Sequence, residues 1–337
     1  MDVPESTPRV GVLLCNLGTP DAPTASALRR YLAEFLWDRR VVEAPRPLWW
    51  LVLNGIILRV RPKKSARAYQ RVWTDAGSPL LVISREQAAA LEADLSERLP
   101  QTVKVVVGMR YGNPSIAAGL TELQHAGCER ILVLPMFPQY SGATNASVLD
   151  AVGMALRKVR KIPELRMIRD FHNDPGYLDA LAQSIRRHWE THSRAQKLLF
   201  SFHGIPESYA LKGDPYPEHC VHTARELATR LGLEQDAWML VYQSRFGLQR
   251  WLTPYADKTL EALPGQGIKQ VDVVCPGFSA DCLETIDEMA LENKEVFLEA
   301  GGEDYRYIPA LNAHPDHISA LGDLVVRHLG GWVEPRP

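Results

Sequence analysis

The sequence predicts an α/β protein built from two similar Rossmann-like halves, each a parallel sheet flanked by helices. Two observations support this prediction. Short β-branched runs alternate with segments of helical periodicity, which is typical of parallel sheets. The runs are VGVLLCNL (10–17), VKVVVGM (103–109), ILVLPMF (131–137), LLFSFH (198–203), WMLVYQS (238–244) and VDVVCP (271–276). The last three runs also end in motifs that resemble the ends of the first three, in the same order.

Three pairs of motifs mark this internal repeat. G-T-P (18–20) corresponds to G-I-P (204–206), R-Y-G (110–112) to R-F-G (245–247), and P-M-F (135–137) to P-G-F (276–278). A duplication explains both the identities and their order. Parallel sheets of this kind bind ligands at the carboxyl ends of their strands, where all these motifs fall. We therefore expect the functional site to lie between the two halves.

Length and composition agree with a folded two-domain protein. The chain has 337 residues, of which 46% are hydrophobic and 23% charged, so it can bury a sizeable core. We expect a first domain over 1–140, a second over 141–312, and a terminal helix over 313–337 that packs back on the first. The net charge of −2 provides no positive field for nucleic acid, which is excluded as a partner.

The cysteines and the amino terminus predict a cytoplasmic protein. The five cysteines form an odd set without a C-x-x-C pair, which suits reduced thiols. The first ten residues, MDVPESTPRV, lack the basic and apolar regions of a signal peptide. The longest apolar stretch, 48–60, is interrupted by Asn54 and Gly55 and is too short to span a bilayer.

His203 is the first candidate for chemistry. It ends the strand LLFSFH, and Gly204 and Pro206 prevent that strand from continuing. The imidazole is thus presented at the carboxyl edge of the sheet, where it can accept a proton or bind a metal ion near neutral pH. The alternative is a histidine that only caps the end of a strand.

A row of acids follows the last strand of the repeat. Asp281, Glu284, Glu288 and Glu292 recur at spacings of three and four residues, which places them on one face of a helix expected to start near Ser279 or Asp281. Carboxylates leading inward could conduct a divalent cation or remove protons. A solvated acidic face is the alternative, and we prefer it for Glu292 and Glu295.

Other motifs are weaker. Neither His219, Cys220 and His222 nor the pair His188 and His192 supplies a full zinc set. The chain has no G-x-x-x-x-G-K-[ST] loop and no G-x-G-x-x-G after a strand, which argues against a nucleotide enzyme. The segment 46–61, with two tryptophans and flanking arginines, is typical of an element that touches a membrane surface, although core packing remains a comparable interpretation.

The motifs taken together resemble one known family over nearly the whole chain. The motifs resemble those of bacterial ferrochelatases, which are the ferro-lyases that catalyse the last step of haem biosynthesis. The most specific of them are S-F-H-G-I-P (201–206), G-D-P-Y (213–216) and F-S-A-D-C-L-E-T (278–285). Further similar motifs are LLCNLGTP (13–20), P-K-K-x-x-x-x-Y (62–69), G-S-P (77–79), MRYGNP (109–114), FPQYS (137–141), YQSRFG (242–247) and W-L-x-P (251–254).

The resemblance implies a chelatase-type fold and a lyase that inserts Fe²⁺ into protoporphyrin IX with release of two protons. His203 matches the family's active-site histidine and Glu284 the carboxylate that faces it across the porphyrin, so both are expected at the metal. Glu288 matches the next acid along the helix, and 46–61 matches the lip over the cleft. The expected substrate-binding positions are Leu17, Arg61, Arg110, Tyr111, Tyr140, Trp251 and Phe278.

The resemblance also bears on cofactors. Fe²⁺ is expected as a substrate, and no cofactor is expected to be bound permanently. Family members with a [2Fe–2S] cluster usually supply thiolates from a carboxyl-terminal extension, whereas this chain has no cysteine after Cys282 and carries Gly142 at the internal cluster position. We therefore expect no iron–sulfur cluster. Cys282 stands where animal members carry histidine, so no role of that histidine is transferred.

Three other functions remain as alternatives. A related chelatase could insert iron into coproporphyrin or cobalt into a precorrin-type ring, and would then need more cationic side chains around the mouth of the site. A porphyrin or haem carrier would need an apolar slot and an axial ligand, but not Glu284 facing His203. A nucleotide-dependent transferase would need the phosphate loop that the sequence lacks.

Overall fold

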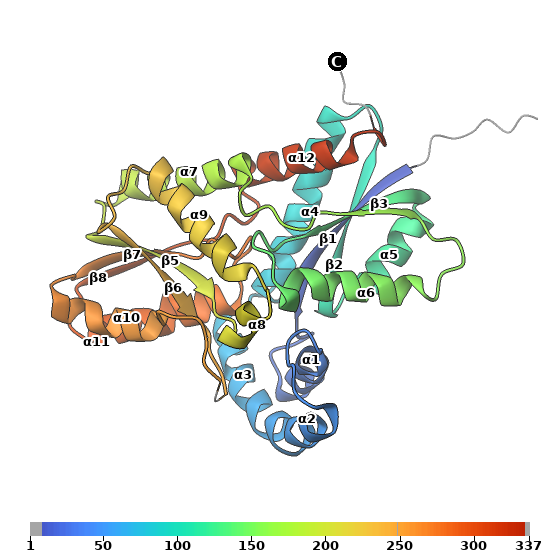
Figure 1. Cartoon of the computed structure of the whole chain (residues 1–337). Helices are drawn as coiled ribbons and strands as arrows, with labels where there is room; N and C mark the ends of the chain where they lie inside the picture. Colours follow the sequence, from blue (N-terminus) through green and yellow to red (C-terminus); the bar gives the residue numbers. More distant parts are fainter. Residues whose placement is uncertain (1–8, 248, 334–337) are drawn as a thin grey trace, which may run out of the picture.

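Two four-stranded parallel sheets form the frame of the computed structural model, which describes residues 9–247 and 249–333 (Figure 1). The first sheet has the order β2-β1-β3-β4, and its strands are β1 (Arg9–Thr19), β2 (Val103–Gly112), β3 (Cys128–Pro135) and β4 (Glu164–Met167). The second has the order β6-β5-β7-β8, and its strands are β5 (Lys197–His203), β6 (Trp238–Gln243), β7 (Gln270–Val274) and β8 (Asp304–Ile308). The strand order is the same in both, which confirms the predicted similarity of the two halves.

The edge strands β4 and β8 were not expected from the sequence. Each is short, with the sequences ELRM and DYRYI, and neither contains the run of buried β-branched residues that marks the other strands. β4 pairs with β3 from Arg130–Glu164 to Val133–Met167, and β8 pairs with all of β7. Edge strands are half-covered and carry charged residues, so their sequence signal is weak.

The pairing of β4 moves the boundary between the halves. β4 belongs to the first sheet, and it is reached from β3 through η2 (Gly142–Ala146) and α6 (Ser147–Leu156), which packs on α5 (Ile116–His125) and β2. The first half therefore extends past residue 140, where the sequence analysis ended it. The reason is the missed edge strand, whose crossover helix was assigned to the wrong half.

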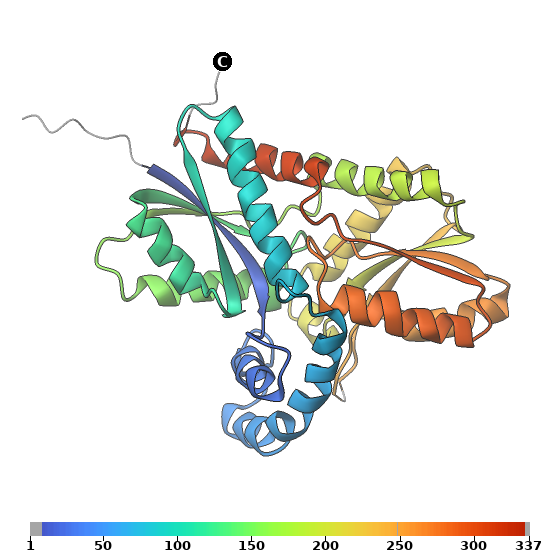
Figure 2. The same ribbon diagram turned by 180° about the vertical axis from the view of Figure 1, so that it is seen from behind.

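The terminal helix joins the halves along one side of the molecule (Figures 1 and 2). α12 (Pro315–Leu329) packs against α4 (Pro79–Arg98) of the first half and against α7 (Pro175–Thr191), which precedes β5. Arg187 on α7 binds Asp316 at 2.6 Å, and Arg98 on α4 binds Asp323. The terminal helix thus contacts the second half as well as the first; residues 334–337 of the expected helix lie outside the described residues.

Helices near the amino terminus form a separate layer below the first sheet (Figures 1 and 2). They are α1 (Ala25–Trp37), α2 (Arg46–Val52), η1 (Leu53–Ile57) and α3 (Leu58–Val72). The amphipathic α3 buries Leu58 and Tyr69 against Leu28 and Leu36 of α1, so one apolar cluster holds the layer together. α3 thereby reaches across toward the second half.

The remaining helices cover the second sheet and complete the cores. They are α8 (Glu207–Leu211), α9 (Tyr216–Arg230), α10 (Ala256–Ala262), η3 (Leu263–Gln266), η4 (Glu284–Glu292) and α11 (Asn293–Glu299). One apolar cluster runs through both halves, from Leu14 on β1 to Phe200 on β5 and Leu321 on α12. A continuous core of this kind fixes the two sheets relative to each other, and with them the strand ends that carry the site.

Candidate active site between the two sheets

A cavity of about 930 Å³ lies at the carboxyl ends of the central strands. The first half contributes Asn16, Leu17 and Gly18 from β1, and the second contributes His203 from β5. The walls come from α1 and α3 on one side and from η4 on the other. The cavity is therefore where the sequence analysis expected the site, between the halves.

His203 is the last residue of β5 and is half-buried in the cavity wall. Its Nδ1 lies 2.6 Å from the carbonyl oxygen of Gly204. A carbonyl can only accept, so Nδ1 carries the proton and the neutral ring keeps its lone pair on Nε2. Glycine is favoured at 204 because a Cβ would make tight contacts, 3.1 Å from the Gln243 carbonyl and 3.2 Å from the Trp251 ring. The ring is thus oriented with one nitrogen free for a proton or a metal ion.

Gln243 connects His203 to Glu284. Its carbonyl accepts the N–H of Gly204 at 2.7 Å, and its side-chain amide donates to the carbonyl of Glu284 at 2.9 Å. Its Oε1 accepts from Ser201 at 2.8 Å, so this buried side chain is bonded at both ends. Gln243 was not expected at the site from the sequence, although it lies in the motif YQSRFG. One side chain thereby positions both elements that carry the candidate catalytic groups.

Glu284 is the first residue of η4, and its side chain lines the cavity. Burial, together with the charge of Glu284, raises the pKa of the neighbouring Cys282 thiol. The thiol therefore stays protonated beside the carboxylate. Glu284 is half-buried and is the first member of the acid row.

η4 is a nine-residue π-helix, a rare conformation that is frequently found at functional sites. Its i→i+5 bonding is seen where the N–H of Asn293 donates to the carbonyl of Glu288. Glu284, Glu288 and Glu292 all line the cavity, and Glu292 is exposed. Burial raises the pKa of Glu288 to about 7, although hydrogen bonds from Ser244 oppose the shift. The row thus contains a carboxyl group able to exchange protons at neutral pH.

Asp281 does not belong to this row, which corrects the sequence analysis. The helix begins only after it, and its side chain does not line the cavity. Asp281 accepts hydrogen bonds from Tyr307 at 2.7 Å and Asn312 at 2.8 Å. It also accepts one from Thr285 at 2.9 Å. These contacts make Asp281 an anchor for the turn that leads into η4.

Arg71 of α3 binds the outer part of the acid row. Its guanidinium lies 2.5 and 2.6 Å from the two carboxylate oxygens of Asp287 and 2.8 Å from Glu292. Asp287 is buried, so this contact fixes α3 against η4. Neither residue was selected from the sequence, because the partners are far apart in the chain.

The expected substrate-binding positions divide into two groups. Leu17, Arg61 and Phe278 line the cavity, and the Arg61 guanidinium lies over the Phe246 ring at 5.3 Å from its centroid. The other four do not line it; they are Arg110, Tyr111, Tyr140 and Trp251. Sequence analysis missed Tyr31 and Tyr69, which complete the first-half wall. Tyr69 could have been found from the motif P-K-K-x-x-x-x-Y.

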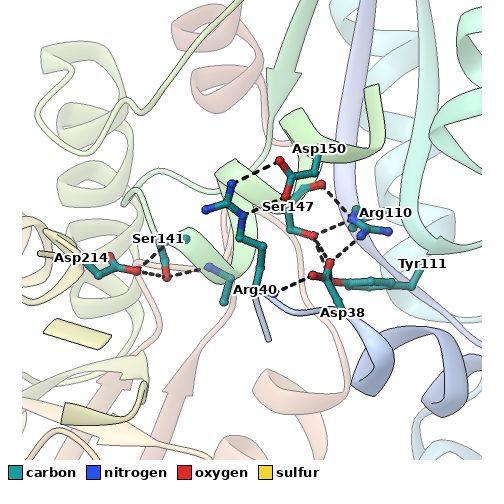
Figure 3. Close-up of polar contacts among 10 residues, drawn as sticks. Asp38, Arg40, Arg110, Tyr111, Ser141, Ser147, Asp150 and Asp214 are labelled. Atoms are coloured by element: carbon teal, nitrogen blue, oxygen red, sulfur yellow. Dashed lines mark hydrogen bonds and ion pairs between the residues drawn. The ribbon is translucent and has the colours of Figure 1, made fainter. Parts of the chain in front are cut away.

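Arg110 and Tyr111 are engaged in a polar cluster beside the cavity (Figure 3). Arg110 pairs with Asp38 and bonds the Ser147 hydroxyl at 2.6 Å, while the Tyr111 hydroxyl donates to Asp38 at 2.8 Å. Tyr111 is fully buried. The cluster therefore joins β2, α6 and the end of α1 instead of offering groups to a ligand.

The other two residues support the site from behind. Trp251 is buried and donates its ring N–H to the Phe246 carbonyl at 3.0 Å. The Tyr140 ring lies under the guanidinium of Arg169, 4.8 Å from its centroid. Trp251 thus contacts Phe246, and Tyr140 follows Gln139, so both adjoin residues that line the cavity.

A group of metal-type ligands lies elsewhere, at Asp170, His172 and His219. The two rings are stacked, with 3.6 Å between centroids and 12° between planes. Imidazole lone pairs lie in the ring plane, so stacked rings direct them in parallel and not toward one ion. His219 instead accepts the N–H of Tyr140 at 3.2 Å, and Cys220 is fully buried. The cluster thus supports the segment at Tyr140.

Comparison with known proteins decides the family. The family model described as Ferrochelatase matches residues 9–329, which is nearly the whole chain. The chain belongs to the ferrochelatase family. A ferrochelatase of Thioalkalivibrio sulfidiphilus is 59% identical over 97% of this chain and 89% of its own length. A ferrochelatase of Nitrosococcus oceani is 56% identical over 98% of this chain and 89% of its own.

Solved structures agree on the fold. SirB of Bacillus subtilis, solved with Fe³⁺, is 11% identical and covers 96% of each chain with a TM-score of 0.54. CbiX, described as the terminal enzyme of sirohaem biosynthesis in denitrifying bacteria, is 13% identical with a TM-score of 0.52 and covers 96% of this chain. Two Rossmann-like sheets of the chelatase type are thus confirmed. As a ferrochelatase family member the chain is a metal chelatase, and the family implies a porphyrin and a metal ion as substrates.

Proposed function

We propose that this enzyme inserts Fe²⁺ into protoporphyrin IX, releasing two protons, at the cavity between the two sheets. The observation that carries the proposal is the linkage of His203 and Glu284 through Gln243 at one apolar cavity. An imidazole and a carboxylate are the two kinds of group that the reaction needs, a ligand for the incoming ion and an acceptor for pyrrole protons.

The wall residues and the polar residues of the cavity have different roles in this reaction. Leu17, Tyr69 and Phe278 provide apolar and aromatic surface against which a flat macrocycle can pack. Binding energy from these walls favours a distorted ring, in which the pyrrole lone pairs are exposed. The free Nε2 of His203 meets the ion or a proton there. Each of the two pyrrole protons leaves on a protein base and reaches solvent along the acid row.

The test is anaerobic incubation of the purified enzyme with Fe²⁺ and a panel of porphyrins, followed by the absorbance of the metallated product. We expect turnover with protoporphyrin IX. Binding of porphyrin without turnover of any member would identify a carrier and overturn the proposal. Faster turnover of coproporphyrin than of protoporphyrin IX would show that coproporphyrin is the preferred substrate.

The panel includes coproporphyrin because of three cations on α3. Arg61, Lys64 and Arg67 line the cavity, and none of them forms an ion pair within residues 9–247 and 249–333. Cations of this kind suit the carboxylates of a porphyrin. Protoporphyrin carries two carboxylates and coproporphyrin carries four, so coproporphyrin can form more ion pairs with these three cations. Lys64→Ala should therefore weaken the binding of coproporphyrin more than that of protoporphyrin.

The enzyme is further proposed to be cytoplasmic, with weak peripheral contact to membranes. Within the described chain, no helix has the length and apolar character needed to cross a bilayer. The lip surface, defined here as Leu48, Trp50, Leu51, Ile56 and Val60, has side chains that are 54 to 68% exposed. The exposed Arg59 lies beside it on α3 and can meet anionic headgroups.

Flotation with anionic liposomes tests this contact. The double substitution Trp50→Ser, Leu51→Ser should reduce flotation without lowering the melting temperature. Leu211→Ser is the matched control, because Leu211 is 87% exposed but lies on α8. Trp49 is unsuitable, since its ring N–H donates to the Leu36 carbonyl at 2.7 Å and anchors the lip. Equal flotation of all variants would contradict the membrane contact.

A further inference from the structure

Ser244 has an unusual backbone. It follows the end of β6 with φ of +59°, and only Asn312 shares a positive φ among the described residues other than glycine. A side chain other than glycine adopts this left-handed region at a cost, and such residues cluster at functional sites. Ser244 lies in the wall of the cavity.

The conformation directs two donors of Ser244 at one carboxylate. Its backbone N–H donates to Oε1 of Glu288 at 2.7 Å, and its hydroxyl donates to Oε2 of the same group. Within the described chain these are the hydrogen bonds that the Glu288 carboxylate accepts from the protein. Two donors on two oxygens fix both the position and the rotation of the group.

Glu288 occupies the middle of the acid row. Glu284 precedes it by one helical turn at the cavity, and Glu292 follows by one turn at the surface, where Arg71 binds it. The titratable groups packed near Glu288 from other elements are Cys275, at the end of β7, and Tyr305 of β8. Burial keeps both of them neutral, so they offer Glu288 no charge.

We propose that Ser244 is a positioning residue that fixes the Glu288 carboxylate between Glu284 and Glu292, keeping the row continuous from cavity to surface. The inference rests on the proposed function and adds to it the residue that holds the relay in place. A proton that reaches Glu284 passes to Glu288 and then to Glu292 and water. Each carboxylate accepts one proton and releases one, so the row returns to its starting state.

The test compares Ser244→Ala with Ser244→Gly in the purified enzyme. Both remove the hydroxyl, but glycine accepts the positive φ and alanine does not. Because the hydroxyl stabilises the ionised carboxylate, its loss raises the pKa of Glu288. We expect the acid limb of the kcat–pH profile to move up by about one pH unit in both variants, with the porphyrin KM unchanged. If Ser244 served only the turn, the melting temperature would fall in Ser244→Ala and rise in Ser244→Gly. The kcat–pH profile of both variants would then match that of the native enzyme.

Two further variants sharpen the result. Ser96→Ala removes an exposed serine hydroxyl on α4, outside the cavity, where it donates to the Ala93 carbonyl at 2.7 Å, and should leave the profile unchanged. In Glu288→Gln the acid limb should be lost, and adding Ser244→Ala should then have no further effect on it. If Glu288→Gln is impaired but the Ser244 variants match the native profile, the role of Ser244 is refuted while the acid row stands. If Glu288→Gln itself matches the native enzyme, the proton route of the proposed function fails.

Discussion

Arg71 of α3 and Asp287 of η4 meet in a bidentate ion pair, with Nε 2.5 Å from one carboxylate oxygen and Nη2 2.6 Å from the other. Parallel contacts of this kind fix orientation as well as distance. The pair connects a helix of the first half with the helix that carries the acid row. The pair therefore fixes one contact between α3 and η4, both of which line the cavity.

Arg71→Met should loosen α3 and weaken porphyrin binding. The Arg71 side chain is 48% exposed, so the pair is screened by solvent and its loss should cost about 1 kcal/mol or less, equivalent to about fivefold in affinity. Quenching of protein fluorescence during porphyrin titration measures this. Arg59→Met is the matched control, since Arg59 is an exposed arginine of the same helix that does not line the cavity. Equal losses in both variants would show a general effect of charge.

His203→Ala should leave the fold intact and remove most metal insertion. The ring is at the end of β5 and half-buried, so little packing is lost, whereas its Nε2 is the free nitrogen of the site. Insertion rates and melting temperatures of the purified variant provide the measurement. A folded variant with near-native turnover would contradict the assignment, and a large fall in stability would make His203 a core residue.

Glu284→Gln should lower kcat while porphyrin still binds. Glutamine keeps the shape of the side chain but cannot take a proton, and a positioned acid or base contributes about 10²–10⁴-fold. Single-turnover insertion and porphyrin titration separate the two effects. Glu295→Gln, a change on the exposed surface of α11, is the control. Native insertion by Glu284→Gln would reduce the acid row to a solvated surface.

Asp38→Asn should destabilise the fold at neutral pH and less so in acid. Burial pushes the pKa of Asp38 up, but hydrogen bonds from Ser147, the Arg40 N–H and Tyr111, with the charge of Arg110, bring it below its ordinary value. A lowered pKa stabilises the folded state above the unfolded pKa, and this contribution is lost as the pH falls through the folded pKa. We expect about 3 kcal/mol at neutral pH.

Denaturant unfolding of the native protein and Asp38→Asn at neutral and acidic pH measures this difference. Asp150→Asn is the control, because Asp150 binds Arg40 at 2.8 Å in a half-exposed pair (Figure 3). A destabilisation that stays constant over the whole pH range would show that Asp38 acts through shape alone.

The purified protein should be colourless, without an iron–sulfur cluster. A cluster needs several thiolates in one place, and the five cysteines are buried and free. Burial raises the pKa of Cys220, Cys275 and Cys282, which keeps these thiols protonated. Visible absorbance together with stoichiometric sulfide in protein prepared without oxygen would contradict this. Cys128→Ala should retain insertion activity.

The sequence was most informative at the ends of buried strands. His203 ends β5 and Leu17 lies two residues before the end of β1, and both line the cavity as expected. Arg110 also lies two residues before the end of a strand, yet it pairs with Asp38, 72 residues away, and does not line the cavity. Pairing between such distant residues leaves no periodic signal in one sequence, so the sequence could not separate the two cases.

The acid row shows a second limit. Helical spacing placed Asp281 on the same face as Glu284, but spacing does not say where a helix begins. Tyr307 and Asn312, both from the segment around β8, hold Asp281 outside η4. Arg71 and Ser244 could not be selected from the sequence for the same reason. Their place in the site follows from contacts with distant carboxylates, Asp287 for Arg71 and Glu288 for Ser244.

The repeated strand order has one more consequence. The motif pairing sets Leu17, before Gly18 on β1, against His203, before Gly204 on β5, and both side chains line the same cavity. Two equivalent positions of a duplicated frame thus differ in chemistry, one aliphatic and the other basic. A planar ligand that bound with its faces reversed would present to His203 the face that had been next to Leu17. The site can therefore distinguish the two faces of a flat molecule.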